Sequence, residues 1–381
     1  MSHSEELFVN SSYEQSLARG KSSANPSYRR GRVLHISLNV VLNCKKPNCM
    51  KETLVIILIL ISQITFSQDN KTVITPTIHH ELDGKNILYC PTFEISWTNL
   101  RESLFEGEDI KIKPSPDYLK HLNDSKVKLE EFNSSHSLAY SGIVSQAIAD
   151  SLNKIRNRQF YQIETDFSDY IGSLISYACI DLKLKYKTDF EIMHYPLDFD
   201  SNRVKSFGIK YNPYDHKEIG KQVSVIDYKN EDDFVVELKL NDTDYELYLA
   251  KVPSKENIHE IYNQVNLRIE TGIRDTLVFN DYLQIPIIDF DLKRIYSELM
   301  NKNFKNKCCN DLYFNSVYQS IKLRMDEKGV DMVSESLEEV FCVPKHFMIF
   351  NKPYMILIRK LDTDLPIFIG WIENSEFMIT E

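Results

Sequence analysis

The sequence has little glycine and none of the common catalytic patterns. Only 11 of its 381 residues are glycine, and no Gly-rich loop of the kind that holds phosphate groups is present. The chain also lacks the Gly-x-Ser-x-Gly turn of serine hydrolases and the His-Glu-x-x-His pattern of zinc proteases. These absences exclude the usual nucleotide-binding and hydrolase motifs, and we expect a protein that is not an enzyme.

A positively charged tract is also missing. The chain carries 45 Lys and Arg against 55 Asp and Glu, a formal net charge of -10. A protein that binds nucleic acid needs a basic face for the phosphates, and no stretch interleaves basic and aromatic residues as a single-strand groove does. We therefore expect no nucleic-acid partner. A hydrophobic content of 43% indicates a folded, globular chain.

The cysteines and histidines do not form a recognisable metal motif. No second Cys or His pair lies at metal-ligand spacing from Cys308-Cys309. His79 and His80 are adjacent, and adjacent residues of a strand point to opposite faces. His194 and His346 stand alone. We expect no metal site and no cofactor, and we interpret the five cysteines after residue 67 as buried or surface thiols without a disulfide framework, namely Cys90, Cys179, Cys308, Cys309 and Cys342.

Two pairs of carboxylates each share one face of a strand pattern. They are Asp198 with Asp200 and Asp289 with Asp291, each pair separated by a phenylalanine. Such pairs can act as general acid and base, but solvated strand ends have the same pattern. We favour the second interpretation.

A short apolar run follows Met50. Lys51 and the run from Leu54 to Ile61 precede Thr65-Phe66-Ser67, which has small residues at its first and third positions. This order is typical of a secretory signal peptide, although a buried strand or helix is the alternative. The run is shorter than the roughly 20 residues that span a bilayer. We expect no membrane span in the mature chain.

This leader divides the sequence into three predicted parts. Residues 1–49 are a disordered upstream extension, because Ser, Asn, Arg and Lys dominate there without periodicity. Residues 50–67 are the signal peptide, which begins at Met50. Residues 68–381 are a single domain, which we expect to be secreted or periplasmic.

Helical spacing comes first in this domain and strand patterns dominate later. Apolar residues recur at helical spacing over 95–104 and 138–155, and residues 170–192 change to the alternation of a strand. Strand-like runs follow, including residues 263–279, with a short helix expected over 291–304. The order predicts one α+β domain with early helices.

A long polar segment connects two strand patterns near the C-terminus. Ile321, Leu323 and Met325 alternate in a strand that ends in Asp-Glu-Lys-Gly at 326–329, and Phe-Asn-Lys-Pro-Tyr follows at 350–354. Two apolar strands around Asp-Thr-Asp close the chain. The order resembles the serpin family, in which a reactive-centre loop of this length separates these two motifs.

Other stretches occur in the same order as in that family. They are residues 86–97, 175–191 and 283–299, so the resemblance spans roughly 75–375. It implies a serpin-like α+β fold with a large mixed central sheet, a second sheet and an exposed loop at about 330–349. The leader adds the expectation of a divergent bacterial member.

Several family positions differ in this chain. Tyr186 and Leu184 replace the Trp and Gly of the Lys-Gly-Lys-Trp motif, and Gln319 stands where the family has a histidine. Cys90 replaces the Ser before Pro91, and Ala178 replaces an asparagine. These family residues form a polar network that lets the central sheet open, and that network is not recognisable here.

The resemblance implies that the loop is bait for a protease and can insert into the main sheet after cleavage. Family hinges carry small residues, whereas this segment has Met332 and Glu335. Overpacking at Met332 would cost about 1–3 kcal/mol, and an unpaired buried carboxylate several kcal/mol. The hinge residues expected from the resemblance are Glu327, Lys328, Gly329, Val330 and Met332.

The family spacing places the cleaved bond near Val343-Pro344. Proline after the cleaved bond blocks most serine proteases, so we expect the bait among Phe341, Cys342 and Val343. An apolar or small bait suits chymotrypsin-like, elastase-like or cysteine proteases. The resemblance implies either a secreted inhibitor of a serine or cysteine protease or a non-inhibitory serpin-fold module that binds another protein.

Overall fold

The structure is a computed structural model that describes residues 71–132, 135–160, 165–210, 217–277, 281–327, 346–361, 363 and 365–381. The chain divides into two compact units, Met1–Phe66 and Ser67–Glu381, and all described residues belong to the second. The expected extension and signal peptide lie outside the described residues. So do Lys328, Gly329 and the loop through residue 345.

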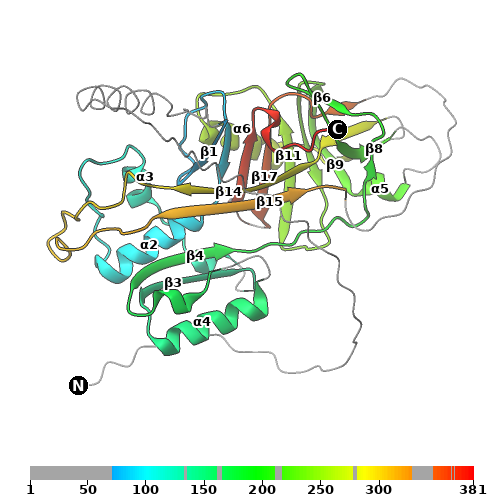
Figure 1. Ribbon diagram of the computed structural model, residues 1–381. Coiled ribbons are helices and arrows are strands. Elements are labelled where there is room, and N and C mark those ends of the chain that lie inside the picture. The colour runs from blue at the N-terminus through cyan, green and yellow to red at the C-terminus, as the bar shows by residue number, and fades with distance from the viewer. Residues whose placement is uncertain are drawn as a thin grey trace, which may run out of the picture. The chain divides into compact units, whose positions relative to one another are not determined.

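An eight-stranded mixed sheet is the largest element of the fold (Figure 1). Its first two strands are parallel and the other neighbours are antiparallel. In order across the sheet the strands are β1 (Thr72–Thr75), β2 (Asn86–Tyr89), β18 (Pro366–Ile372), β17 (Tyr354–Lys360), β11 (Tyr245–Lys251), β10 (Asp233–Leu238), β9 (Val223–Asn230) and β12 (Asp275–Thr276). Three central strands, β10, β11 and β18, are almost fully buried because both faces of the sheet are covered.

Helix α6 (Ile258–Thr271) covers one face of this sheet. Its buried residues Ile258, Ile261, Val265 and Ile269 pack with Trp371 of β18 and residues of the neighbouring strands. The spacing of three and four residues places these side chains on one side of the helix.

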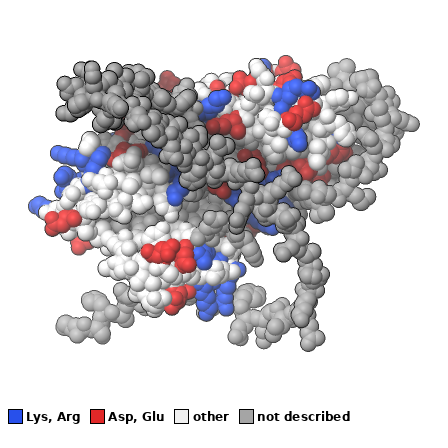
Figure 2. All heavy atoms as spheres, in the orientation of Figure 1, with Lys and Arg blue, Asp and Glu red and all other residues white. Residues whose placement is uncertain are grey.

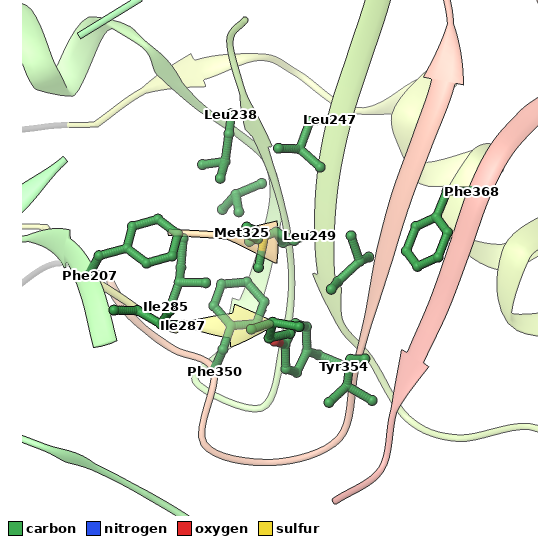
Figure 3. Packing of buried hydrophobic residues seen from close by; sticks show 14 of the residues in the cluster. Phe207, Leu238, Leu247, Leu249, Ile285, Ile287, Met325, Phe350, Tyr354 and Phe368 are labelled. Carbon is green, nitrogen blue, oxygen red and sulfur yellow. The ribbon is translucent and has the colours of Figure 1, made fainter. Parts of the chain in front are cut away.

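A four-stranded sheet covers the other face. Its order is β16 (Phe347–Ile349), β13 (Tyr282–Pro286), β8 (Ser206–Ile209) and β5 (Glu191–Ile192). The main core fills the space between the two sheets, as Figure 3 shows for Phe207, Leu249, Ile285 and Phe350. Gly208 of β8 is essential to this packing, because a Cβ there would lie 2.0 Å from the Leu283 carbonyl oxygen.

Two further pairs of strands lie beside this core. Strand β3 (Ser137–Ile143) pairs with β4 (Leu174–Ile180), and β14 (Ile288–Ile295) pairs with β15 (Tyr318–Met325). Helix α2 (Thr92–Leu104) contacts both β3 and β4. Helix α4 (Gln146–Gln159) packs on the β3–β4 pair through Ala149 and Leu152.

The remaining elements are short. They are the hairpin β6 (Leu197–Phe199) with β7 (Asn202–Val204), the helices α3 (Leu119–Asp124) and α5 (Lys217–Lys221), and the 3₁₀ turns η1 (Leu129–Glu131), η2 (Phe167–Tyr170) and η3 (Ser375–Phe377). Within the described ranges, no helix has the length and apolar character needed to cross a membrane.

The α+β class with a large mixed sheet, a second sheet and early helices is confirmed. The helix α2 and the strands β15, β17 and β18 lie where the sequence predicts them. However, β15 is paired with β14 alone and does not belong to the eight-stranded sheet, whereas the closing hairpin does.

Four local predictions are wrong. Residues 170–192 do not form one long strand, because β4 ends at Ile180 and residues 181–190 lie outside any described strand. Residues 258–271 form helix α6 and not a strand, because Asn257 caps the helix by accepting a hydrogen bond from the Glu260 backbone N–H. Residues 137–143 form β3, and the helix begins only after the Ser145 cap. The short helix expected at 291–304 is largely the end of β14 followed by turns.

Candidate functional site

Strand β15 leads to the segment that the sequence singles out. Gln319, Ile321 and Met325 point into the core, while Tyr318, Ser320 and Lys322 are exposed. Met325 reaches the main cluster between the sheets (Figure 3). This anchor holds the end of β15 immediately before Asp326 and Glu327. Of the expected hinge residues only Glu327 is described; Lys328, Gly329, Val330 and Met332 lie outside the described residues.

Strands β4 and β15 lie alongside each other without a shared ladder (Figure 1). The pKa of Tyr170, just before β4, is raised to about 12, chiefly by the neighbouring side chain of Tyr318 at the start of β15, so the two side chains lie close together. Beyond the other ends of the two strands, the Phe190 N–H donates to the Glu327 carbonyl oxygen at 3.2 Å. The starts of β4 and β15 therefore lie close together, and so do the segments that follow their ends. The two strands run in the same direction.

The facing edges of β4 and β15 have no described strand between them. A strand that turned back after Glu327 would be antiparallel to both neighbours, which is the arrangement that a short connection allows. Ala178, Ile180, Ile321 and Leu323 line the core beneath these edges, so alternate side chains of an added strand would face apolar surroundings.

Gln319 holds β15 to the start of helix α2. Its side-chain N–H₂ donates to the Cys90 carbonyl oxygen at 3.0 Å and to the Thr92 hydroxyl at 3.1 Å. Its side-chain oxygen accepts from the Tyr296 hydroxyl at 3.0 Å. The sequence identified Gln319, Cys90 and Ala178 as departures from a polar network. The structure shows that Gln319 makes a polar connection of its own, while Cys90 and Ala178 pack as small apolar groups against the main core.

Tyr186 is buried beyond the end of β4. Its ring packs edge-on against Phe190 at 4.7 Å between centroids. Burial, followed by the negative charges of Asp326 and Glu327, raises the pKa of the Tyr186 hydroxyl well above its usual value. Tyr186 therefore lies next to the end of β15.

The far end of the segment is anchored by two motifs. His346 donates its backbone N–H to the Asp281 carboxylate at 3.0 Å and leads into β16. Asn351 then accepts a hydrogen bond at 2.8 Å from the buried ammonium of Lys251, which also donates to the Ile349 carbonyl oxygen. Residues on both sides of the undescribed segment are thus fixed. The bait residues Phe341, Cys342 and Val343 lie outside the described residues.

The two pairs of carboxylates that the sequence singled out lie in or next to strands. Asp289 and Asp291 form cross-strand ion pairs with Arg324 at 3.0 Å and Lys322 at 3.5 Å, on the exposed face of the β14–β15 pair. Asp198 is exposed and Asp200 lies in a turn with a positive φ of 46°. All four carboxylates are exposed, which agrees with the solvated interpretation.

The described cysteines are free thiols. Cys308 is exposed and Cys309 is buried, with their sulfur atoms 2.6 Å apart. Burial raises the pKa of Cys309 to about 11, so this thiol is protonated at neutral pH. Cys90 and Cys179 are described as well, and burial raises the pKa of each. Cys342 lies outside the described residues.

The described surface carries charges of both signs. Figure 2 shows acidic and basic side chains interspersed on the visible face, with no continuous basic tract there.

Comparisons with known proteins identify structural neighbours only. No family model and no curated protein sequence matches the chain. Serpin48, a highly specific serpin of the insect Tenebrio molitor, matches at a TM-score of 0.41 and 12% identity, covering 75% of this chain and 91% of that chain. Thyroxine-binding globulin in complex with thyroxine matches at 0.43 and 12%, covering 76% and 93%. SRPN18 of Anopheles gambiae matches at 0.43 and 12%, covering 77% and 93%.

Proposed function

We propose that the chain is a serpin-like protein, secreted or periplasmic, that presents residues 330–349 to a serine or cysteine protease as an inhibitor. The observation that supports this most directly is the pair of facing edges at β4 and β15. They run in the same direction, no described ladder joins them, and the segment that would fill them starts where β15 ends.

The chemistry belongs to the protease. Its serine or cysteine nucleophile attacks the carbonyl carbon of a bait residue among Phe341, Cys342 and Val343, and the amine of the following residue leaves with a proton. The chain contributes only the cleavable loop and the edges that receive it. The part of the loop before the cleaved bond ends in the acyl group that is bonded to the protease. Insertion of this part would then carry the protease away from its original position.

Insertion has a favourable and an unfavourable side. Each inserted residue gains backbone hydrogen bonds worth about 0.5–1.5 kcal/mol each, along a strand as long as the eight residues of β15. Met332 and Glu335 oppose this through overpacking and desolvation. The ladder summed over the strand exceeds these penalties, so we expect a net gain in stability after cleavage.

A second function is supported by Gln319. Its three hydrogen bonds hold β15 to Cys90, Thr92 and Tyr296. They would resist any movement of β15 away from β4 that makes room for an added strand. In that case the chain acts as a non-inhibitory module that binds another protein, and a protease would simply cut the loop.

One experiment separates the two functions. The chain is incubated with a chymotrypsin-like protease and, separately, with a papain-like cysteine protease. The products are analysed on an SDS gel and by thermal unfolding. An inhibitor yields an SDS-resistant complex and a cut form with a much higher melting temperature.

Cleavage near residues 341–343 without a complex and without a gain in melting temperature would reject inhibition. The variant with Met332→Ala and Glu335→Ala is the matched control. If it recovers the stability gain, the hinge side chains blocked insertion; if not, the Gln319 connection is the obstacle. Localisation is tested separately by N-terminal sequencing of the exported protein, which should begin near Gln68.

A further inference from the structure

Three histidines from distant parts of the sequence lie together at the surface of the domain. The His79 ring stacks on His121 at 4.3 Å between centroids and lies against His259 at 4.5 Å. His79 belongs to the connection after β1, His121 to α3 and His259 to the first turn of α6. Figure 1 labels β1, α3 and α6 in the same part of the molecule.

The backbone beneath two of these rings is held rigidly. The carbonyl oxygen of His80 accepts from the Ile258 N–H at 3.0 Å, and the Leu82 N–H donates to the Glu256 carbonyl oxygen at 2.9 Å. These two bonds tie the connection that carries His79 to the start of α6, which carries His259.

Helix α3 is held in place independently. The Asn123 side-chain oxygen accepts hydrogen bonds from the Trp97 indole at 3.0 Å and from the Ile110 backbone N–H at 3.1 Å. Leu119 and Leu122 are buried in the cluster that includes Trp97. His121 therefore projects from a fixed helix, and only its side chain is free to rotate.

We propose that His79, His121 and His259 bind one divalent transition-metal ion of the class that prefers imidazole nitrogen, which includes Zn²⁺, Ni²⁺ and Cu²⁺. Three imidazoles with a water molecule complete a tetrahedral zinc site. Mg²⁺ and Ca²⁺ prefer oxygen ligands and would not bind there.

The rings must turn for this to happen. In the described part of the chain, no three His, Cys, Asp or Glu side chains are already arranged to hold a metal ion. The His79 and His121 side chains are exposed, and His259 is half-buried with the Asn263 side-chain amide 3.4 Å from its ring nitrogens, so binding requires the three rings to leave their present contacts. Because the backbones are fixed, the ion would join three segments that are far apart in sequence.

The test is a titration of the full chain with ZnCl₂, followed by calorimetry, with MgCl₂ as the comparison metal. The expected result is one Zn²⁺ per chain, no Mg²⁺ binding, and a higher melting temperature with Zn²⁺. His79→Ala, His121→Ala and His259→Ala should each abolish binding. His194→Ala removes an exposed histidine elsewhere and should leave binding unchanged.

Each variant is first compared with the unaltered chain by circular dichroism and metal-free melting. Should His259→Ala fail to fold, the exposed His79→Ala and His121→Ala variants decide the question, and His121→Gln provides a conservative second change. A chain that takes up no Zn²⁺, or one whose binding survives both His79→Ala and His121→Ala, would overturn the proposal.

Discussion

The eight-stranded sheet and the β4–β15 region use similar strands in opposite ways. The inner strands of the large sheet have ladder partners on both sides and apolar cover on both faces. Strands β4 and β15 are also partly buried, yet each has a described ladder on one side only. In the eight-stranded sheet, a substitution in an inner strand can only lower stability, because the partners and the apolar cover are already complete. Under the proposed function the β4–β15 region would also gain stability, because an added strand would pair with edges that already lie over the core.

The largest expected effect comes from damage to the closed sheet. Trp371 of β18 is buried in the contact with α6, and its indole N–H donates to Glu373 at 2.7 Å. Trp371→Ala leaves a large cavity and should lower the free energy of unfolding by about 3–5 kcal/mol. Urea unfolding measures this. Tyr318→Ala, at an exposed position of β15, is the comparison and should cost far less; equal losses would contradict the distinction between the two regions.

The next effect concerns helix α2, which supports β3 and β4. Burial raises the pKa of Glu94 to about 7, although hydrogen bonds from Ser125 and Tyr89 act in the opposite direction. The folded state therefore holds this proton more tightly than the unfolded state, whose pKa is close to 4.5. The contribution of Glu94 is full below about pH 4.5 and is lost as the pH rises through about 7.

Glu94→Gln should remove that dependence. Relative to the variant, the unaltered chain should lose about 3 kcal/mol of unfolding free energy across this range, at 1.36 kcal/mol per pKa unit. Urea unfolding at a series of pH values tests the sign as well as the size. A difference between the two proteins that grows as the pH falls would show that Glu94 is ionised in the folded state.

A smaller effect separates two buried glutamines. Gln319 connects β15 to α2, and Gln284 of β13 donates to the Ser206 hydroxyl at 2.8 Å. Each change to leucine should cost about 1–3 kcal/mol, because hydrogen-bond partners are left unsatisfied. Only Gln319→Leu should also speed loop insertion after cleavage. If Gln284→Leu accelerates insertion equally, the connection to α2 does not control the facing edges.

Local patterns predicted the elements whose signal is local. The alternation of Ile321, Leu323 and Met325 marked β15, and the two apolar runs around Asp-Thr-Asp marked the β17–β18 hairpin. Helix α6 was missed although it has a local signal too: Asn257 stands three residues before Glu260, a spacing typical of a helix start.

Contacts between distant residues could not be predicted from such patterns. Gln319 was identified only as a departure from a family position, and its partners Cys90 and Tyr296 are brought to it by the fold. His79 was judged against its neighbour His80, whereas its ring contacts come from residues 121 and 259. Pairings of this kind depend on how sheets and helices assemble, and a single sequence carries no direct record of them.

The smallest expected effect comes from the ion pairs of the two regions. Arg324 pairs with Asp289 at 3.0 Å, and both side chains are largely exposed. Arg359 of β17 pairs with Glu246 at 2.6 Å, where both are nearly buried. Exposed pairs contribute about 0–1 kcal/mol because water and salt screen them, so Asp289→Asn should barely change urea unfolding. Glu246→Gln leaves Arg359 without its charged partner in a desolvated place and should cost more. A loss of more than about 2 kcal/mol in Asp289→Asn would mean that the outer face of β14–β15 is not solvated as described.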